Sequence, residues 1–176
     1  MAPPTSTATG SAIRLAAALA VAVALLWPST ASAQDEKGRF GIGLILGEPT
    51  GVSVKYYLTD TTALDGAVGG AFVGRGVQFH GDFLWHPSAL IIDSNETFVL
   101  PAYVGIGARL LSVEKSSSAS DHLRIGARFV AGLLFDFRKI PIDVFAEIAG
   151  TADFLTLDDD KFGIGFNAGG GVRYYF

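Results

Sequence analysis

Apolar and polar residues alternate with a period of two in a series of short runs that begin at Arg39. The last run shows this most clearly. Its apolar positions include Phe162, Ile164, Phe166 and Val172, and the positions between them carry mainly glycine, asparagine and arginine. A period of two places successive side chains on opposite faces of a β-strand. The pattern therefore predicts strands that have one apolar face and one small or polar face.

Clusters of turn-forming residues separate eight such runs. The predicted strands span residues 39–47, 51–58, 62–73, 77–86, 97–112, 122–137, 142–154 and 162–176. The breaks contain residues typical of turns, such as Glu48-Pro49-Thr50-Gly51 and Arg138-Lys139-Ile140-Pro141. Most runs reach or approach the about 9 to 11 residues that a tilted strand needs to cross a bilayer. An even count also returns the chain to its starting side, as transmembrane barrels require.

The orientation of the two faces decides the class of protein. In the run at 77–86, Phe79 and Phe83 share the apolar face, and His80 and Asp82 share the polar face. A lipocalin-like barrel turns its polar face to water, whereas a transmembrane barrel turns its apolar face to lipid. The polar faces carry nearly matched numbers of both charge signs, and buried charges are tolerable only when paired. We therefore predict an all-β fold, an eight-stranded antiparallel up-and-down transmembrane β-barrel.

The polar faces are expected to form a network of paired charges inside this barrel. An eight-stranded barrel is just wide enough for its own side chains to fill the interior. The sequence thus predicts a plugged, salt-bridged interior and no wide pore. The predicted members of the network are Lys55, Asp65, His80, Asp82, Arg109, Arg124, Arg128, Asp136, Asp143, Glu147, Asp153 and Arg173.

Residues 1–33 have the features of a secretory signal peptide. Arg14 precedes an apolar stretch from Leu15 to Leu26, and Ala31-Ser32-Ala33 supplies small residues before Gln34. The apolar stretch is shorter than the about 20 residues that a transmembrane helix needs. We therefore expect a cleaved signal at 1–33 and a barrel domain at 34–176.

Aromatic residues close the last run at Tyr174 and Phe176. A terminal Phe preceded by alternating hydrophobic and aromatic residues resembles the signal by which bacterial outer-membrane barrels are passed to their assembly machinery. Aromatic residues near strand ends are also typical of the girdles that meet the membrane interface. The candidates for this girdle are Tyr56, Tyr57, Trp85, Tyr174 and Tyr175.

Composition excludes several other classes of protein. The chain has no cysteine, so it has no disulfide, thiolate metal site or lipid-modified cysteine. Its formal net charge is -4 and it has no basic cluster, which argues against a nucleic-acid partner. Beyond the signal, no apolar run reaches about 18 residues without a charge, so a helical membrane protein is excluded. Hydrophobic residues nevertheless make up 49% of the chain, as expected of a barrel.

His80, Asp82 and His86 form the one cluster that suggests chemistry. On a strand that rises about 3.3 Å per residue, His80 and His86 lie about 20 Å apart, too far to share a metal ion. A His and Asp pair can activate a serine nucleophile, but no serine is identifiably placed to join it. We therefore expect a hydrogen-bonded interior pair, with no catalytic residue, metal or cofactor. A lipid-modifying barrel enzyme is the alternative.

Several segments resemble a family of small, mostly uncharacterised outer-membrane barrels, similar in architecture to the OmpA transmembrane domain and OmpX. The segments are 43–57 (GLILGEPTGVSVKYY), 80–86 (HGDFLWH), 100–107 (LPAYVGIG) and 169–176 (GGGVRYYF). The resemblance implies a location in the bacterial outer membrane after secretion through the periplasm. It also implies two kinds of partner, the outer-membrane lipids, including lipopolysaccharide, and the barrel-assembly machinery. It implies a fold more firmly than an activity.

Two functions are compatible with such a barrel besides the lipid-modifying enzyme. The leading hypothesis is a non-enzymatic integral outer-membrane protein with a structural or surface-interaction role. The alternative is a narrow channel that carries ions or small solutes through the charged interior. Conductance in planar bilayers distinguishes the two.

Overall fold

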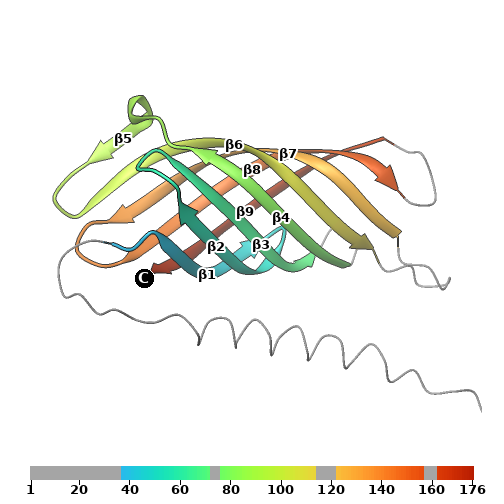
Figure 1. Ribbon diagram of the computed structural model, residues 1–176, viewed down its shortest axis with the longest axis horizontal. Helices are drawn as coiled ribbons and strands as arrows, with labels where there is room; N and C mark the ends of the chain where they lie inside the picture. Colours follow the sequence, from blue (N-terminus) through green and yellow to red (C-terminus); the bar gives the residue numbers. More distant parts are fainter. Residues whose placement is uncertain (1–36, 72–75, 114–121, 157–161) are drawn as a thin grey trace, which may run out of the picture. The chain divides into compact units, whose positions relative to one another are not determined.

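The computed structural model describes residues 37–71, 76–113, 122–156 and 162–176 (Figure 1). The predicted signal peptide lies outside these residues. Within them, no helix is long and apolar enough to cross a membrane. The elements are β1 (Phe40–Gly47), β2 (Thr50–Tyr57), β3 (Thr62–Ala71), β4 (Gly76–Trp85), the 3-10 helix η1 (Ser88–Leu90), β5 (Ile91–Ser94), β6 (Phe98–Val113), β7 (His122–Phe137), β8 (Ile142–Thr156) and β9 (Gly163–Tyr175).

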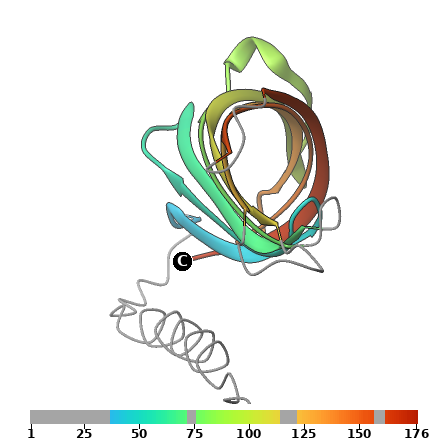
Figure 2. The ribbon, with the colours of Figure 1, turned by 90° about the vertical axis from the view of Figure 1, so that its right-hand side faces the viewer.

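Eight of these strands close into an antiparallel barrel (Figure 2). Each barrel strand pairs with the next one along the chain, and β1 pairs with β9 to complete the ring. β4 pairs directly with β6, although the short β5 lies between them in the sequence. The predicted eight-stranded antiparallel up-and-down barrel is therefore confirmed, with strand bounds within two residues of those expected.

The connection between β4 and β6 contains two elements that the sequence analysis did not predict. It lies at the end of the barrel where β1 begins and β9 ends, which we call the proximal end. The last pair of β4 with β6 is Trp85 with Val104, and β5 then pairs with β6 from Ile91 opposite Pro101 to Ser94 opposite Val99. β5 thus occupies the place beside β6 that β4 leaves empty.

The two faces of each strand differ in exposure as the period of two predicts. In β4, Phe79 and Phe83 are exposed, whereas His80 and Asp82 are buried. Across the described residues, 32 large apolar side chains are exposed. Because the sheet is closed on itself, the buried positions face the barrel interior. The apolar side chains therefore form the outer surface of the barrel.

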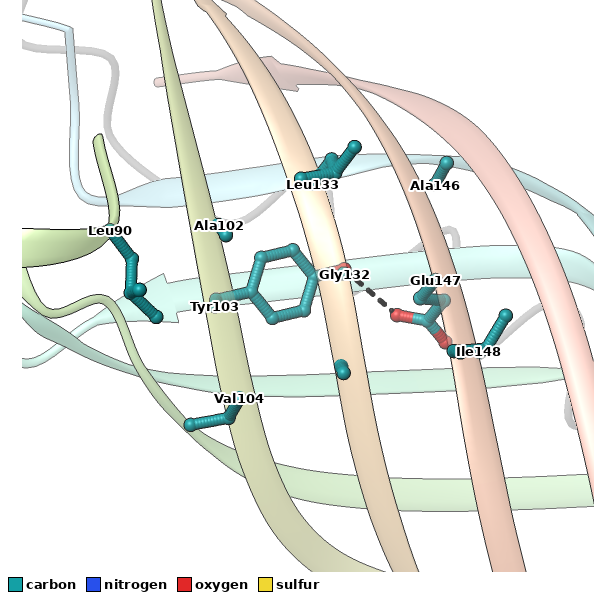
Figure 3. A pocket seen from close by; sticks show the side chains of 10 residues that line it. Leu90, Ala102, Tyr103, Val104, Gly132, Leu133, Ala146, Glu147 and Ile148 are labelled. Carbon is teal, nitrogen blue, oxygen red and sulfur yellow. Dashed lines mark hydrogen bonds between the residues drawn. The ribbon is translucent and has the colours of Figure 1, made fainter. Parts of the chain in front are cut away.

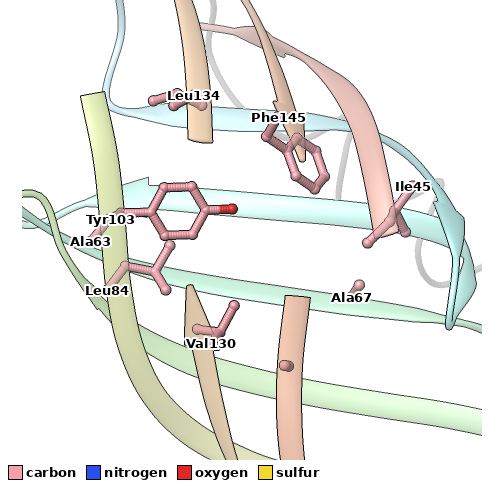
Figure 4. Packing of buried hydrophobic residues seen from close by; sticks show 9 residues of the cluster. Ile45, Ala63, Ala67, Leu84, Tyr103, Val130, Leu134 and Phe145 are labelled. Atoms are coloured by element: carbon pink, nitrogen blue, oxygen red, sulfur yellow. The ribbon is translucent and has the colours of Figure 1, made fainter. Parts of the chain in front are cut away.

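The interior also holds apolar side chains, which the sequence analysis did not assign to it (Figure 4). Most of them lie on strands whose other inward positions include polar side chains. Tyr103 belongs to this cluster and also to the polar network, so it joins the two. The cluster is formed by Ile45, Ala63, Ala67, Leu84, Tyr103, Val130, Leu134, Phe145 and Ala149.

Candidate functional site

Arg128 on β7 is the centre of the first group of paired charges. Its Nε donates to Asp82 Oδ2 on β4 at 2.9 Å, and its Nη2 donates to Glu147 Oε1 on β8. Tyr103 on β6 donates its hydroxyl to the other oxygen of Glu147 at 3.1 Å. All four side chains are buried. One cation therefore pairs with carboxylates from two other strands in the buried interior.

Arg173 on β9 forms a second group nearer the proximal end. Its Nε donates to Asp143 Oδ1 on β8 at 3.1 Å, and its Nη1 donates to Asp65 on β3. Tyr175 donates its hydroxyl to Asp143 Oδ2 at 2.5 Å. The guanidinium carbon lies 3.9 Å from the centre of the Phe145 ring, a cation–π geometry. Arg173 thus contacts charged, polar and aromatic groups from several strands.

Arg109 on β6 forms the third group, nearer the opposite end of the barrel. It holds both oxygens of Asp153 on β8 through Nε at 2.9 Å and Nη2 at 2.8 Å, the bidentate geometry of strong arginine–carboxylate pairs. Its Nη1 donates to Asn167 Oδ1 at 3.2 Å, and Asn167 in turn donates to Gln78 at 3.3 Å. This group therefore links β6, β8, β9 and β4.

Glycine on an intervening strand makes room for several of these contacts. A Cβ atom at Gly132 would lie 2.3 Å from the Tyr103 ring, and one at Gly126 would lie 2.4 Å from Asp153 Oδ1. Glycine allows the close approach because it has no side chain to displace. The arrangement occurs three times, with Gly107 between Asp82 and Arg128, Gly126 between Arg109 and Asp153, and Gly132 between Tyr103 and Glu147.

Lysine side chains lie at the proximal end of the interior. Lys55 Nζ is 2.9 Å from His86 Nε2, and it lies 4.8 Å and 5.2 Å from the ring centres of Tyr57 and Tyr103. Lys37 forms an ion pair with the partly exposed Asp136. At the proximal end, lysine and aromatic side chains therefore take the place of the arginine–carboxylate pairs.

His80 and Asp82 are both buried on β4, but the hydrogen bond expected between them is not formed. Their closest atoms, Nε2 and Oδ2, are 3.9 Å apart, and that oxygen of Asp82 accepts from Arg128. Within the described residues, neither ring nitrogen of His80 has a hydrogen-bond partner. The same part of the chain contains no group of three His, Asp or Glu side chains that could hold a metal ion.

Arg124 does not lie in the buried network, contrary to the expectation from its position in the period. It is exposed, although it shares its parity along β7 with Arg128. The pairing of β7 with β8 shifts register between Ile125 and Gly126, and Arg124 lies opposite Thr156, the last residue of β8. Arg124 is therefore exposed because it lies at the mouth of the barrel, beyond the buried ion pairs.

The aromatic residues of the last strand divide between the two faces. Tyr174 and Phe176 are exposed, with ring centres 5.0 Å apart. Tyr175 is buried and bonded to Asp143, and Tyr57 is half-buried beside Lys55. The prediction that these two residues belong to an outer girdle is therefore wrong. Tyr56 and Trp85 are exposed, as a girdle requires.

Some members of the interior network were absent from the predicted set. Tyr103 and Asn167 bind its charged groups through neutral side chains, and Gln78 accepts a hydrogen bond from Asn167. The signal that could have found them is the same period of two, since each occupies a position of inward parity. A search limited to charged residues overlooks neutral hydrogen-bonding partners.

No protein-family model matches the chain, and no curated protein matches it. Among solved structures, it is similar to the crystal structure of the N-terminal β-barrel domain of Pseudomonas aeruginosa OprF, with a TM-score of 0.55. The chain has the fold of that domain. The match covers 80% of this chain and 100% of the OprF domain at 20% sequence identity. The resemblance to small barrels of the OmpA type is therefore confirmed at the level of the fold.

Proposed function

We propose that this chain is an integral protein of the bacterial outer membrane. The supporting observation is an exposed apolar outer face around an interior of buried ion pairs. Water-soluble monomers rarely expose contiguous apolar patches larger than a few hundred Å², whereas transmembrane barrels have an apolar outer band and a polar interior. Lipid supplies the missing layer over the outer face.

The proposed role is structural or interactive at the cell surface, without catalysis. Among the described residues, the three buried arginines each bind at least one carboxylate, and this pairing supports an interior filled by its own side chains. Outer-membrane lipids, including lipopolysaccharide, are the proposed partners of the apolar face. The barrel-assembly machinery is the proposed partner of the last strand through Tyr174 and Phe176.

Fractionation of a Gram-negative host that expresses the full chain tests this proposal. We expect the protein in the outer-membrane fraction, with faster gel migration before heating than after it because a folded barrel is compact. Mass spectrometry should find Gln34 as the first residue, since Ala31 and Ala33 precede the cleavage site. An intact Met1, or a water-soluble folded protein, would contradict the proposal.

A narrow channel is the second candidate, and one observation favours it. Eight buried polar side-chain atoms in the described residues lack a hydrogen-bond partner, among them both ring nitrogens of His80, Arg128 Nη1 and Arg173 Nη2. Buried polar groups of this kind commonly bind ordered water. A row of them offers a path for water or small ions. Discrete conductance steps of the purified barrel in planar bilayers would support the channel, and a silent bilayer would support the closed interior.

A further inference from the structure

A hollow of about 450 Å³ lies on the outer surface of the barrel near the proximal end (Figure 3). Two rows of outward side chains on β6, β7 and β8 line it. The first row is Ala102, Leu133 and Ala146, and the second is Val104, Ala131 and Ile148. Leu90 of η1 lies at one side of these rows. We call this feature the outer groove.

Small side chains create the outer groove. Three of its six outward positions are alanine. Along β7, the next outward residues on either side are Phe129 and Phe135, both exposed aromatics. They are six residues apart, so at about 3.3 Å per residue the interval between them is about 20 Å long. The outer surface is therefore lowered locally between two large side chains.

The connection that carries Leu90 is attached beside the groove at more than one point. β5 pairs with β6 through Asp93 and Ser94. Arg138, in the turn between β7 and β8, also donates through Nη2 to Ser94 Oγ at 2.9 Å. Leu90, Ile91 and Ile92 are all exposed. The connection thus adds an apolar side wall to a groove whose floor belongs to the barrel.

We propose that the outer groove holds one acyl chain of a membrane phospholipid more tightly than the surrounding surface does. This inference rests on the proposed location in a membrane. The polar groups of Tyr103 and Glu147, whose residues contribute to the lining, are buried and bond to each other, so they offer no contact to a polar ligand. An open hollow of about 450 Å³ with this apolar lining suits a chain of methylenes.

Trp85 provides a natural reporter for this test. The chain has two tryptophans, Trp27 in the predicted signal and Trp85, so the mature protein has one. Trp85 is exposed on the outer face and lies opposite Val104, which lines the groove. Bromine atoms on an acyl chain in the groove would therefore quench its fluorescence.

The experiment starts with the mature barrel folded in phosphatidylcholine vesicles with brominated acyl chains. The protein is then transferred to a mild detergent and washed free of unbound lipid. We expect the wild-type protein to keep about one lipid phosphate per barrel and its quenched fluorescence. Ala131→Phe fills the groove and should lower the retained lipid at least fivefold. Ala108→Phe, at an outward position of β6 outside the groove, should retain lipid like the wild type.

Leu90→Ala provides a second test, because removing an exposed side chain from the connection should leave barrel folding intact. It should also lower lipid retention. Equal retention in all four proteins would overturn the proposal, as would dimers that form through the groove and disappear in Ala131→Phe. Failure of the membrane assignment has a different signature, since Trp85 would then be unquenched in the intact brominated vesicles.

Discussion

The outer and inner faces of β7 are adjacent in sequence and opposite in chemistry. Phe129 is 61% exposed, while its neighbour Arg128 is 1% exposed and binds Asp82 and Glu147. An outward side chain contributes apolar surface on its own, and in the proposed membrane location lipid completes its environment. The contribution of an inward charge to stability depends on the particular atoms that pair with it. The outer face should therefore respond to polarity and depth, and the inner face to whether a partner is left unpaired.

The largest effect is expected for Arg128→Met. The substitution leaves Asp82 and Glu147 buried without their cation, and removing one partner of a buried ion pair costs about 3–5 kcal/mol. Urea titrations of the barrel in lipid vesicles would measure the loss in the free energy of unfolding. Arg124→Met is the matched control, because Arg124 lies on the same strand but is exposed, and it should change stability by about 0.5 kcal/mol or less. Similar losses in both variants would contradict a role for burial.

Phe129→Arg should have the next largest effect. A charge on the lipid face near the bilayer midplane costs about 2–4 kcal/mol, falling to about 0–1 kcal/mol near the interface. Phe162→Arg tests the depth dependence, since Phe162 is also exposed but precedes the first residue of β9. The same titrations apply to both variants. If the two arginines cost equal amounts, the outer face is not a lipid-facing belt of defined depth.

A smaller loss of stability is expected for Gly132→Ala, which tests the contact that Tyr103 makes with Glu147 across the glycine. The new Cβ would lie 2.3 Å from the Tyr103 ring, so the ring must move and its bond to Glu147 weakens. Overpacking of this kind costs about 1–3 kcal/mol. Gly150→Ala is the control, because a Cβ there meets no atom within 4 Å. The prediction is wrong if the two alanines are equally tolerated.

Deleting Phe176 should have the smallest effect on stability. Burying a whole Phe side chain contributes about 1.5–3 kcal/mol, and Phe176 is 70% exposed, so less than about 1 kcal/mol should be lost. Delivery should nevertheless fail if this residue is an assembly signal. The measurement compares outer-membrane yield in cells with folding in detergent. Unchanged yield in cells would remove the targeting role.

The period of two predicted the eight barrel strands because the strands carry apolar outward residues that alternate with small or polar inward ones. It did not predict β5, since Ile91-Ile92-Asp93-Ser94 is short and does not alternate. Phe145 shares its parity with the inward Asp143 and Glu147, but the period did not show that apolar and charged side chains would share the interior. Strand existence therefore follows from local pattern, and interior composition does not.

The partners within the network could not be read from the sequence. Arg173 and Asp65 are 108 residues apart, and the choice between Asp65 and other inward carboxylates depends on strand tilt and register. Arg124 has the correct parity but lies at the barrel mouth next to a register shift. The glycines are evident in the sequence. That side chains from the two flanking strands meet across them follows only from the strand pairing.

Arg173 also bears on the order in which the barrel assembles. It lies on β9, which closes the ring against β1, and it reaches Asp65 on β3 beyond that seam. This contact cannot form until the final strand arrives, and contacts of such long sequence separation slow folding. Closure of the seam therefore brings together a backbone edge and a buried ion pair. Before it, the chain presents an open strand edge of the kind that recruits another strand.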